Sequence, residues 1–102
     1  MIVFNTTFHV DEGIHEEFIE YMLQKFIPMA TRSGLLTSPR LARVFGKEGD
    51  EGYSYAMEFV ATDIVALERW NTNESQAVHA PLLEMFKEKL IGFSTIMQTV
   101  DY

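Results

Sequence analysis

Alternating large and small side chains in residues 53–61 constrain the fold more than any other stretch of this chain. The segment reads Tyr-Ser-Tyr-Ala-Met-Glu-Phe-Val-Ala, and its large apolar residues occupy every second position. Because successive side chains of a strand point to opposite faces, this pattern predicts a half-buried β-strand. The odd-numbered residues from Tyr53 to Phe59 would face a core, whereas Glu58 and Val60 would lie on a mixed face. Such a strand needs a cover on each face, and we expect helices on one face and a second copy of the protein on the other.

Length and composition predict a single domain spanning residues 1–102. The chain has 102 residues, of which 47% are hydrophobic, which is enough for one modest core. We find no run of about 18 apolar residues and no basic segment before an apolar stretch at the start, so we expect neither a membrane span nor an export signal. The absence of cysteine excludes disulfides and thiolate metal sites, and it agrees with a cytoplasmic protein.

The charge balance disfavours nucleic acid and anionic membranes as partners. The net charge is -7, from 15 acidic and 8 basic residues, and the lysines and arginines form no cluster. Histidines and carboxylates also lack the spacing of a metal site, such as two ligands four residues apart on one helix, so we expect no metal centre. The serines lack the context of a catalytic nucleophile. The sequence therefore predicts no particular reaction, and it leaves open whether the protein is an enzyme.

Periodicity predicts the remaining elements along the chain. Ile2–Val10 is predicted to be a strand whose even-numbered residues face the core. Asn5 and His9 then lie together on the other face. Apolar spacing and capping residues predict two helices, and glycines mark the hairpin loop Gly46–Gly52. The first helix should run from about Glu12 to about Thr31, with Asp11 as its N-cap, and strands are expected at Ser38–Phe45 and Ile91–Val100. The second helix should be capped by Thr62 and interrupted at Asn71–Asn73, and it should restart or kink near Pro81.

This order of elements predicts an α+β fold of the ferredoxin-like type. Strand, helix, strand, strand, helix and strand follow one another, in a βαββαβ arrangement with a hairpin between two helical crossovers. Right-handed crossovers place the first and third strands centrally in a four-stranded antiparallel sheet, with both helices on one face. The uncovered face is too apolar to remain in water, so we expect a homodimer in which two sheets pack face to face. We assign to that interface Val3, His9, Leu41, Arg43, Phe45, Glu58, Val60 and Ile96, with Arg43 opposite or diagonal to Glu58.

The chain resembles a small bacterial family of domains of unknown function, DUF4286-like, within the dimeric α/β-barrel superfamily. The resemblance covers nearly the whole chain. It rests on Met-Ile-Val-Phe-Asn at the start, Phe26-Ile27-Pro28, Tyr53 to Phe59, His79-Ala80-Pro81 and the residues Gly92 to Thr95. The family usually has arginine where this chain has Ser94, so no function tied to that arginine carries over. The resemblance implies the fold and dimerisation, and it implies no catalytic residue.

A weaker resemblance links the chain to heme-degrading monooxygenases of the antibiotic-biosynthesis type. Those proteins have an asparagine on the first strand, a tryptophan on the second helix and a histidine further along that binds heme iron. Asn5, Trp70 and His79 stand in matching places, with His79 nine residues after Trp70. This resemblance implies heme as a cofactor. Strand alternation, however, points Asn5 away from the helices together with His9, so the three side chains do not converge unless the strand is bulged.

The sequence also predicts a small apolar or aromatic ligand between the helices and the sheet. The first helix carries an apolar face, including Phe18, Met22 and Phe26, that is wider than one contact with a sheet requires. We expect the ligand near Phe26, Trp70 and His79, where methionines and aromatic residues can line a pocket. A protein that only mediates interactions remains a third alternative.

Overall fold

Strands β1 (Ile2–Val10) and β3 (Tyr53–Ala61) form the centre of a four-stranded antiparallel sheet in the computed structural model, which describes residues 1–46 and 51–102. Strands β2 (Thr37–Val44) and β4 (Leu90–Gln98) lie at its edges, and the strand order is β2-β3-β1-β4. The predicted ferredoxin-like arrangement is therefore confirmed. Part of the expected hairpin loop, residues 47–50, lies outside the described residues.

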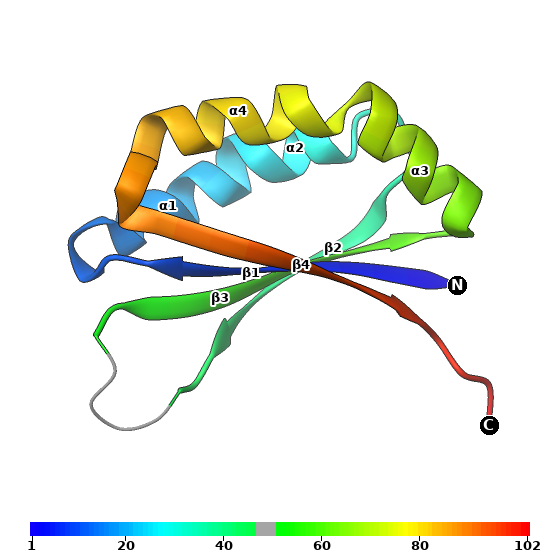
Figure 1. Cartoon of the computed structure of the whole chain (residues 1–102), viewed down its shortest axis with the longest axis horizontal. Helices are drawn as coiled ribbons and strands as arrows, with labels where there is room; N and C mark the ends of the chain where they lie inside the picture. Colours follow the sequence, from blue (N-terminus) through cyan, green and yellow to red (C-terminus); the bar gives the residue numbers. More distant parts are fainter. Residues whose placement is uncertain (47–50) are drawn as a thin grey trace.

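The first helical segment crosses one face of the sheet in four pieces (Figure 1). A 3₁₀ turn at Glu12–Ile14 leads into α1 (His15–Tyr21), a π-helical turn follows at Met22–Phe26, and α2 (Ile27–Ala30) completes the segment. Pro28 has no N–H to donate to the carbonyl four residues earlier, and its ring crowds that carbonyl. The wider π-helical turn immediately before Pro28 accommodates this local conflict.

The second helical segment lies beside the first on the same face (Figure 1). It consists of α3 (Ile64–Asn73), α4 (Ser75–Phe86) and a 3₁₀ turn at Lys87–Lys89. Asp63, and not Thr62 as predicted, is the N-cap of α3, because its side chain accepts a hydrogen bond from the N–H of Ala66 at 2.8 Å. The helix is interrupted at Glu74, and α4 begins at the next residue. Pro81 therefore falls within α4, where its side chain is exposed. In the described parts of the chain, no helix is both long enough and apolar enough to span a membrane.

The core fills the layer between these helices and the sheet. All even-numbered positions of β1 are buried, as predicted, and so are Tyr55, Met57 and Phe59 of β3. Aromatic side chains from both layers interlock; the ring of Phe8, for example, packs edge-on against Phe18 with 5.5 Å between centroids. The largest fully buried side chains are Trp70, Phe18, Phe26, Met22, Leu36, Met57, Leu82 and Val10.

Half of the residues assigned to the opposite face of the sheet lie on the helix side instead. In β2, Leu41 pairs with Met57 and Arg43 with Tyr55, and both partners face the core. The cause is an irregularity between Thr37 and Arg40 that changes the pairing from odd-with-even to odd-with-odd. Phe45 lies beyond the end of β2, and its ring packs against Arg43, with 5.1 Å between Cζ of Arg43 and the ring centroid. The placement of Leu41, Arg43 and Phe45 on the open face, by which we mean the sheet face away from the helices, was therefore wrong.

The same reversal applies to β4 and to the expected ion pair. Ile96 pairs with Phe4 and so lies on the helix side, because even positions of β4 face even positions of β1. Glu58 is paired with Arg40, with 3.2 Å between Nη2 and Oε1, and not with Arg43. Arg43 instead lies over the ring of Tyr53, with 4.6 Å between Cζ and the ring centroid. Cation–π stacking thus replaces the predicted cross-strand ion pair of Arg43.

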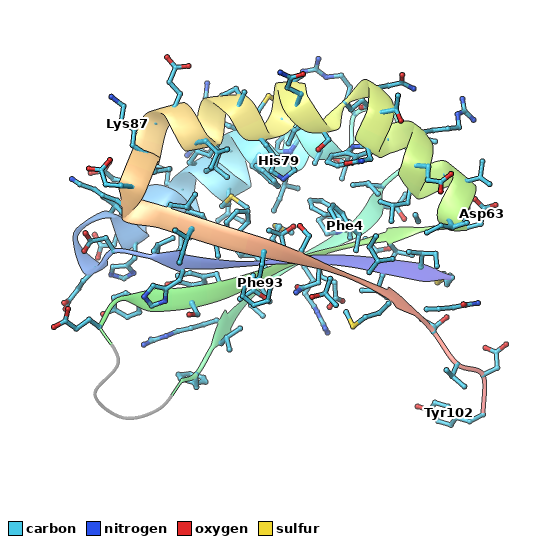
Figure 2. All side chains as sticks on the ribbon, in the orientation of Figure 1. Phe4, Asp63, His79, Lys87, Phe93 and Tyr102 are labelled. Carbon is cyan, nitrogen blue, oxygen red and sulfur yellow. The ribbon has the colours of Figure 1, made fainter. Side chains whose placement is uncertain are left out.

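Val3, His9, Glu58 and Val60 do lie on the open face, as predicted. They are joined there by Ile91, Phe93 and Met97 of β4, which pair with odd-numbered residues of β1 and are exposed. Phe93 projects from the side of the sheet away from the helices (Figure 2). The open face therefore combines an apolar edge along β4 with a polar centre that contains Asn5 and Glu58.

Candidate functional site

A cleft of 330 Å³ opens between the second helical segment and the β4 edge of the sheet. The cleft exists because the middle of β4 presents two small residues, Gly92 and Ser94, to the helices. The ring of Phe8 fills the space opposite Gly92, and the space opposite Ser94 stays open. The hydroxyl groups of Ser94 and Thr6 lie 2.9 Å apart, so Thr6 is satisfied although it is buried. The cleft is lined by Phe4, Ile64, Leu67, Glu68, Asn71, Ser75, His79, Ser94 and Ile96.

His79 is the sequence-predicted ligand residue that lines this cleft. Its Nδ1 lies 2.9 Å from the backbone oxygen of Ser75 and 3.2 Å from the hydroxyl of the same residue. A carbonyl oxygen only accepts hydrogen bonds, so Nδ1 carries the proton. In the neutral ring Nε2 is then a hydrogen-bond acceptor, and it makes no hydrogen bond with any described residue. Figure 2 shows His79 and Phe4 in the layer between helices and sheet.

Trp70 and Phe26 lie behind His79 and do not line the cleft. The indole N–H of Trp70 donates to the backbone oxygen of Ala30 at 2.9 Å, which ties α3 to the end of α2. The centroids of its ring and of the His79 ring are 6.1 Å apart, and Phe26 packs edge-on against His79 at 5.5 Å. Both aromatic residues are fully buried. Together they fix the orientation of the imidazole.

Asn5 lies on the opposite face of the sheet from Trp70 and His79. It pairs with Glu58 and Thr95, and its Nδ2 donates to the hydroxyl of Thr7 at 3.0 Å. β1 has no irregularity that would turn Asn5 towards the helices, since its pairing with β3 is continuous. Trp70 and His79 therefore lie close together, as the weaker resemblance requires, whereas Asn5 does not join them.

The described residues that line the cleft include one acidic side chain and several neutral polar ones. Glu68 is the one acidic or basic residue, histidine aside, among the described residues that line it, and no lysine or arginine does so. Asn71, Ser75 and Ser94 add neutral polar groups beside the apolar side chains. Across residues 1–46 and 51–102, no three histidine, aspartate or glutamate side chains are grouped so that they could hold a metal ion.

Sequence reasoning missed most of the cleft lining. Glu68 and Asn71 follow Ile64 and Leu67 at helical spacing, so their shared side of α3 was readable from the sequence. The contribution of β4 could not be read from the sequence. Gly92 and Ser94 carry too little apolar surface to show which face of the sheet they occupy. Ser94 was predicted neither as a nucleophile nor as a ligand residue; it is the position at which this chain departs from the family's usual arginine.

The fold recurs in solved structures of low sequence identity. A dimeric ferredoxin-like protein from an uncultured marine organism superposes with a TM-score of 0.72 and 16% identity, over 99% of this chain and 95% of that one. A putative antibiotic biosynthesis monooxygenase from Deinococcus radiodurans gives 0.69 and 10%, over 100% and 95%. A mutant of MhuD with two manganese protoporphyrin IX molecules bound per active site gives 0.67 and 14%, over 100% and 97%. At these identities, the likeness concerns the fold alone.

Comparisons of sequence give one clear match. The profile of a domain of unknown function, DUF4286, matches residues 1–100. No curated protein sequence shows significant similarity to this chain.

Proposed function

Because this chain belongs to the DUF4286 family, a domain of unknown function, we propose a function from its own geometry. The protein is a homodimer that binds a small, mainly apolar aromatic molecule in the cleft between α3, α4 and β4. One observation carries this proposal: Nε2 of His79 has no hydrogen-bond partner among the described residues, and His79 lines a cleft whose other walls include Phe4, Leu67 and Ile96. An apolar pocket with a few fixed polar groups is the usual form of a small-molecule site.

The size of the cleft limits the ligand. Its volume of 330 Å³ lies near the lower end of the range for ligand pockets, about 300–1,000 Å³. One or two fused aromatic rings suit such a space better than a tetrapyrrole. The ring of the ligand would contact Phe4, Leu67 and Ile96, while a polar substituent would meet His79.

Heme fits these residues poorly. Asn5, the strand residue of the proposed heme set, lies on the other face of the sheet, and the N–H of Trp70 is already bound to Ala30. The described cleft residues also include no lysine or arginine to pair with the two carboxylates of heme. Trp70 and His79 alone are better explained as a core contact that orients the imidazole.

Two copies would pack through their open faces. Ile91 and Phe93 expose 67% and 66% of their surface there, and Met97 exposes 42%, so that the three form an apolar strip along β4. Contiguous apolar patches of this kind mark interaction surfaces. The Oδ1 atom of Asn5, in the polar centre of this face, is buried within the single chain and has no hydrogen-bond partner among the described residues.

Neighbouring residues of α3 provide a matched test of the ligand site. Ile64 lines the cleft and Val65 does not, although both are exposed. We expect 3-methylindole to bind the native protein in isothermal titration calorimetry and to raise its Tm, since a ligand that binds the folded state stabilises it. Ile64→Trp should reduce this binding at least about tenfold by filling the cleft, whereas Val65→Trp should leave it unchanged, since about 1.4 kcal/mol corresponds to a factor of ten in affinity.

The two variants also separate the possible failures. Binding that survives in Ile64→Trp would place the ligand elsewhere on the molecule. Equal losses in Ile64→Trp and Val65→Trp would indicate that the helix, and not the cleft, had been disturbed. Failure of the native protein to bind 3-methylindole or related bicyclic aromatics at millimolar concentration would contradict the proposal itself.

A further inference from the structure

We infer that the cleft selects aromatic amines over aromatic carboxylic acids of the same ring system. This inference rests on the proposed function and adds the chemical class of the ligand. Glu68 is the one formally charged side chain among the described cleft residues, and it lies at the exposed side of α3 beside Leu67, which is buried. No cationic side chain in that lining offsets its charge.

Two hydrogen-bonding groups of the cleft, Nε2 of His79 and the carboxylate of Glu68, favour a donor on the ligand. Nδ1 of His79 is committed to the carbonyl of Ser75, so in the neutral ring Nε2 is left as an acceptor. The hydroxyl of Ser94 is engaged with Thr6 at 2.9 Å. A carboxylate offers acceptors only and would face both the lone pair of Nε2 and the carboxylate of Glu68. An ammonium group carries three donors and a positive charge, which suits both groups.

The charge of the whole molecule acts in the same direction. With a net charge of -7, the protein attracts cations and repels anions at long range. This background contributes to binding of an amine anywhere on the surface, so it must be separated from the local effect of Glu68. Glu84 provides that separation, because it is an exposed glutamate on α4 that does not line the cleft. Replacing either glutamate by glutamine removes one negative charge.

The experiment compares three indoles that differ in charge. Tryptamine is cationic, 3-methylindole is neutral and indole-3-acetate is anionic near neutral pH. Isothermal titration calorimetry at low salt should give tighter binding of tryptamine than of indole-3-acetate by about tenfold or more, with the difference shrinking as salt is added. Glu68→Gln should bring tryptamine to within about threefold of 3-methylindole, because an exposed charge contributes modestly. Glu84→Gln should leave the preference unchanged.

The outcomes distinguish this inference from the function on which it rests. If 3-methylindole binds and indole-3-acetate binds as tightly as tryptamine, the cleft is a ligand site without selection for amines, and the inference is overturned. The inference also fails if Glu84→Gln lowers the preference as much as Glu68→Gln, since the preference then reflects net charge. If none of the three indoles binds, the proposed function fails as well.

Discussion

Gly92 is the residue of edge strand β4 that lies directly against the ring of Phe8. A Cβ atom at this position would lie 2.8 Å from Cδ1 of Phe8 and 3.4 Å from the backbone oxygen of Thr7. The ring of Phe8 has little freedom to move, since it is buried edge-on against Phe18 and Phe26. Gly92→Ala should therefore lower the free energy of unfolding by about 1–3 kcal/mol, the usual cost of overpacking, as measured by urea denaturation.

Gly13 is the matched control for this substitution. It lies in the 3₁₀ turn before α1, and a Cβ atom there would meet nothing within 4 Å. Gly13→Ala should raise the free energy of unfolding by about 0.5–1 kcal/mol, because alanine loses less backbone entropy on folding than glycine does. If Gly92→Ala were as stable as Gly13→Ala, the ring of Phe8 would have to be mobile in solution, and the packing described here would be wrong.

At the level of elements, the hydrogen bond from Ala66 to Asp63 defines the start of α3. Removal of an N-cap side chain costs about 0.5–2 kcal/mol, so Asp63→Ala should reduce stability by about 1 kcal/mol in urea denaturation. Asp11 precedes the first helical segment but makes no capping hydrogen bond with its side chain. Asp11→Ala should consequently cost less. Equal losses would mean that attraction to the helix dipole, and not the hydrogen bond, accounts for the effect of Asp63.

The elements also reveal what the sequence could specify. Strands β1 and β3 begin and end where alternation placed them, because each has one continuous apolar face. The faces of β2 were misassigned because one irregularity near Ser38, where φ is 51°, reverses the parity of every later residue. In sequence, Ser38 and Pro39 indicate only that the strand begins there. A bulge depends on pairing with β3, and that information is not local.

The candidate site divides in the same way. His79 was predicted as a ligand residue from the weaker resemblance and its spacing from Trp70, and it lines the cleft. Trp70 and Phe26 do lie next to His79, as predicted, but both are buried in the core and do not line the cleft. The indole N–H of Trp70 donates to the backbone oxygen of Ala30, and the ring of Phe26 packs on His79. The wall formed by Ser94 became visible only with the tertiary structure. A cavity forms where short side chains leave volume unfilled between two elements. The periodicity of apolar residues in a sequence does not indicate where such volume lies.

At the level of the whole molecule, apolar side chains are exposed on both faces. The outer surface of the helices exposes Leu83 and Met85 by 52% and 53%, comparable with Phe93 of the open face at 66%. Exposure alone therefore does not identify the interface. We expect the open face to be the interface, because Ile91, Phe93 and Met97 follow one another along one side of β4, whereas Leu83 and Met85 flank the exposed Glu84 in α4. A standard interface buries about 1,600 Å² in total, or about 800 Å² on each copy.

A charge on each surface tests this assignment. The native protein should have the mass of a dimer in sedimentation or light scattering, and Phe93→Asp should shift it to the mass of a monomer, because each interface would then bury two unpaired carboxylates. Leu83→Asp introduces the same charge on α4 and should leave the dimer intact. Since Phe93 is exposed in the single chain, its replacement should preserve the circular dichroism of the fold. A native protein that is monomeric, or a dimer that dissociates with Leu83→Asp and not with Phe93→Asp, would show that the sheets do not pack face to face.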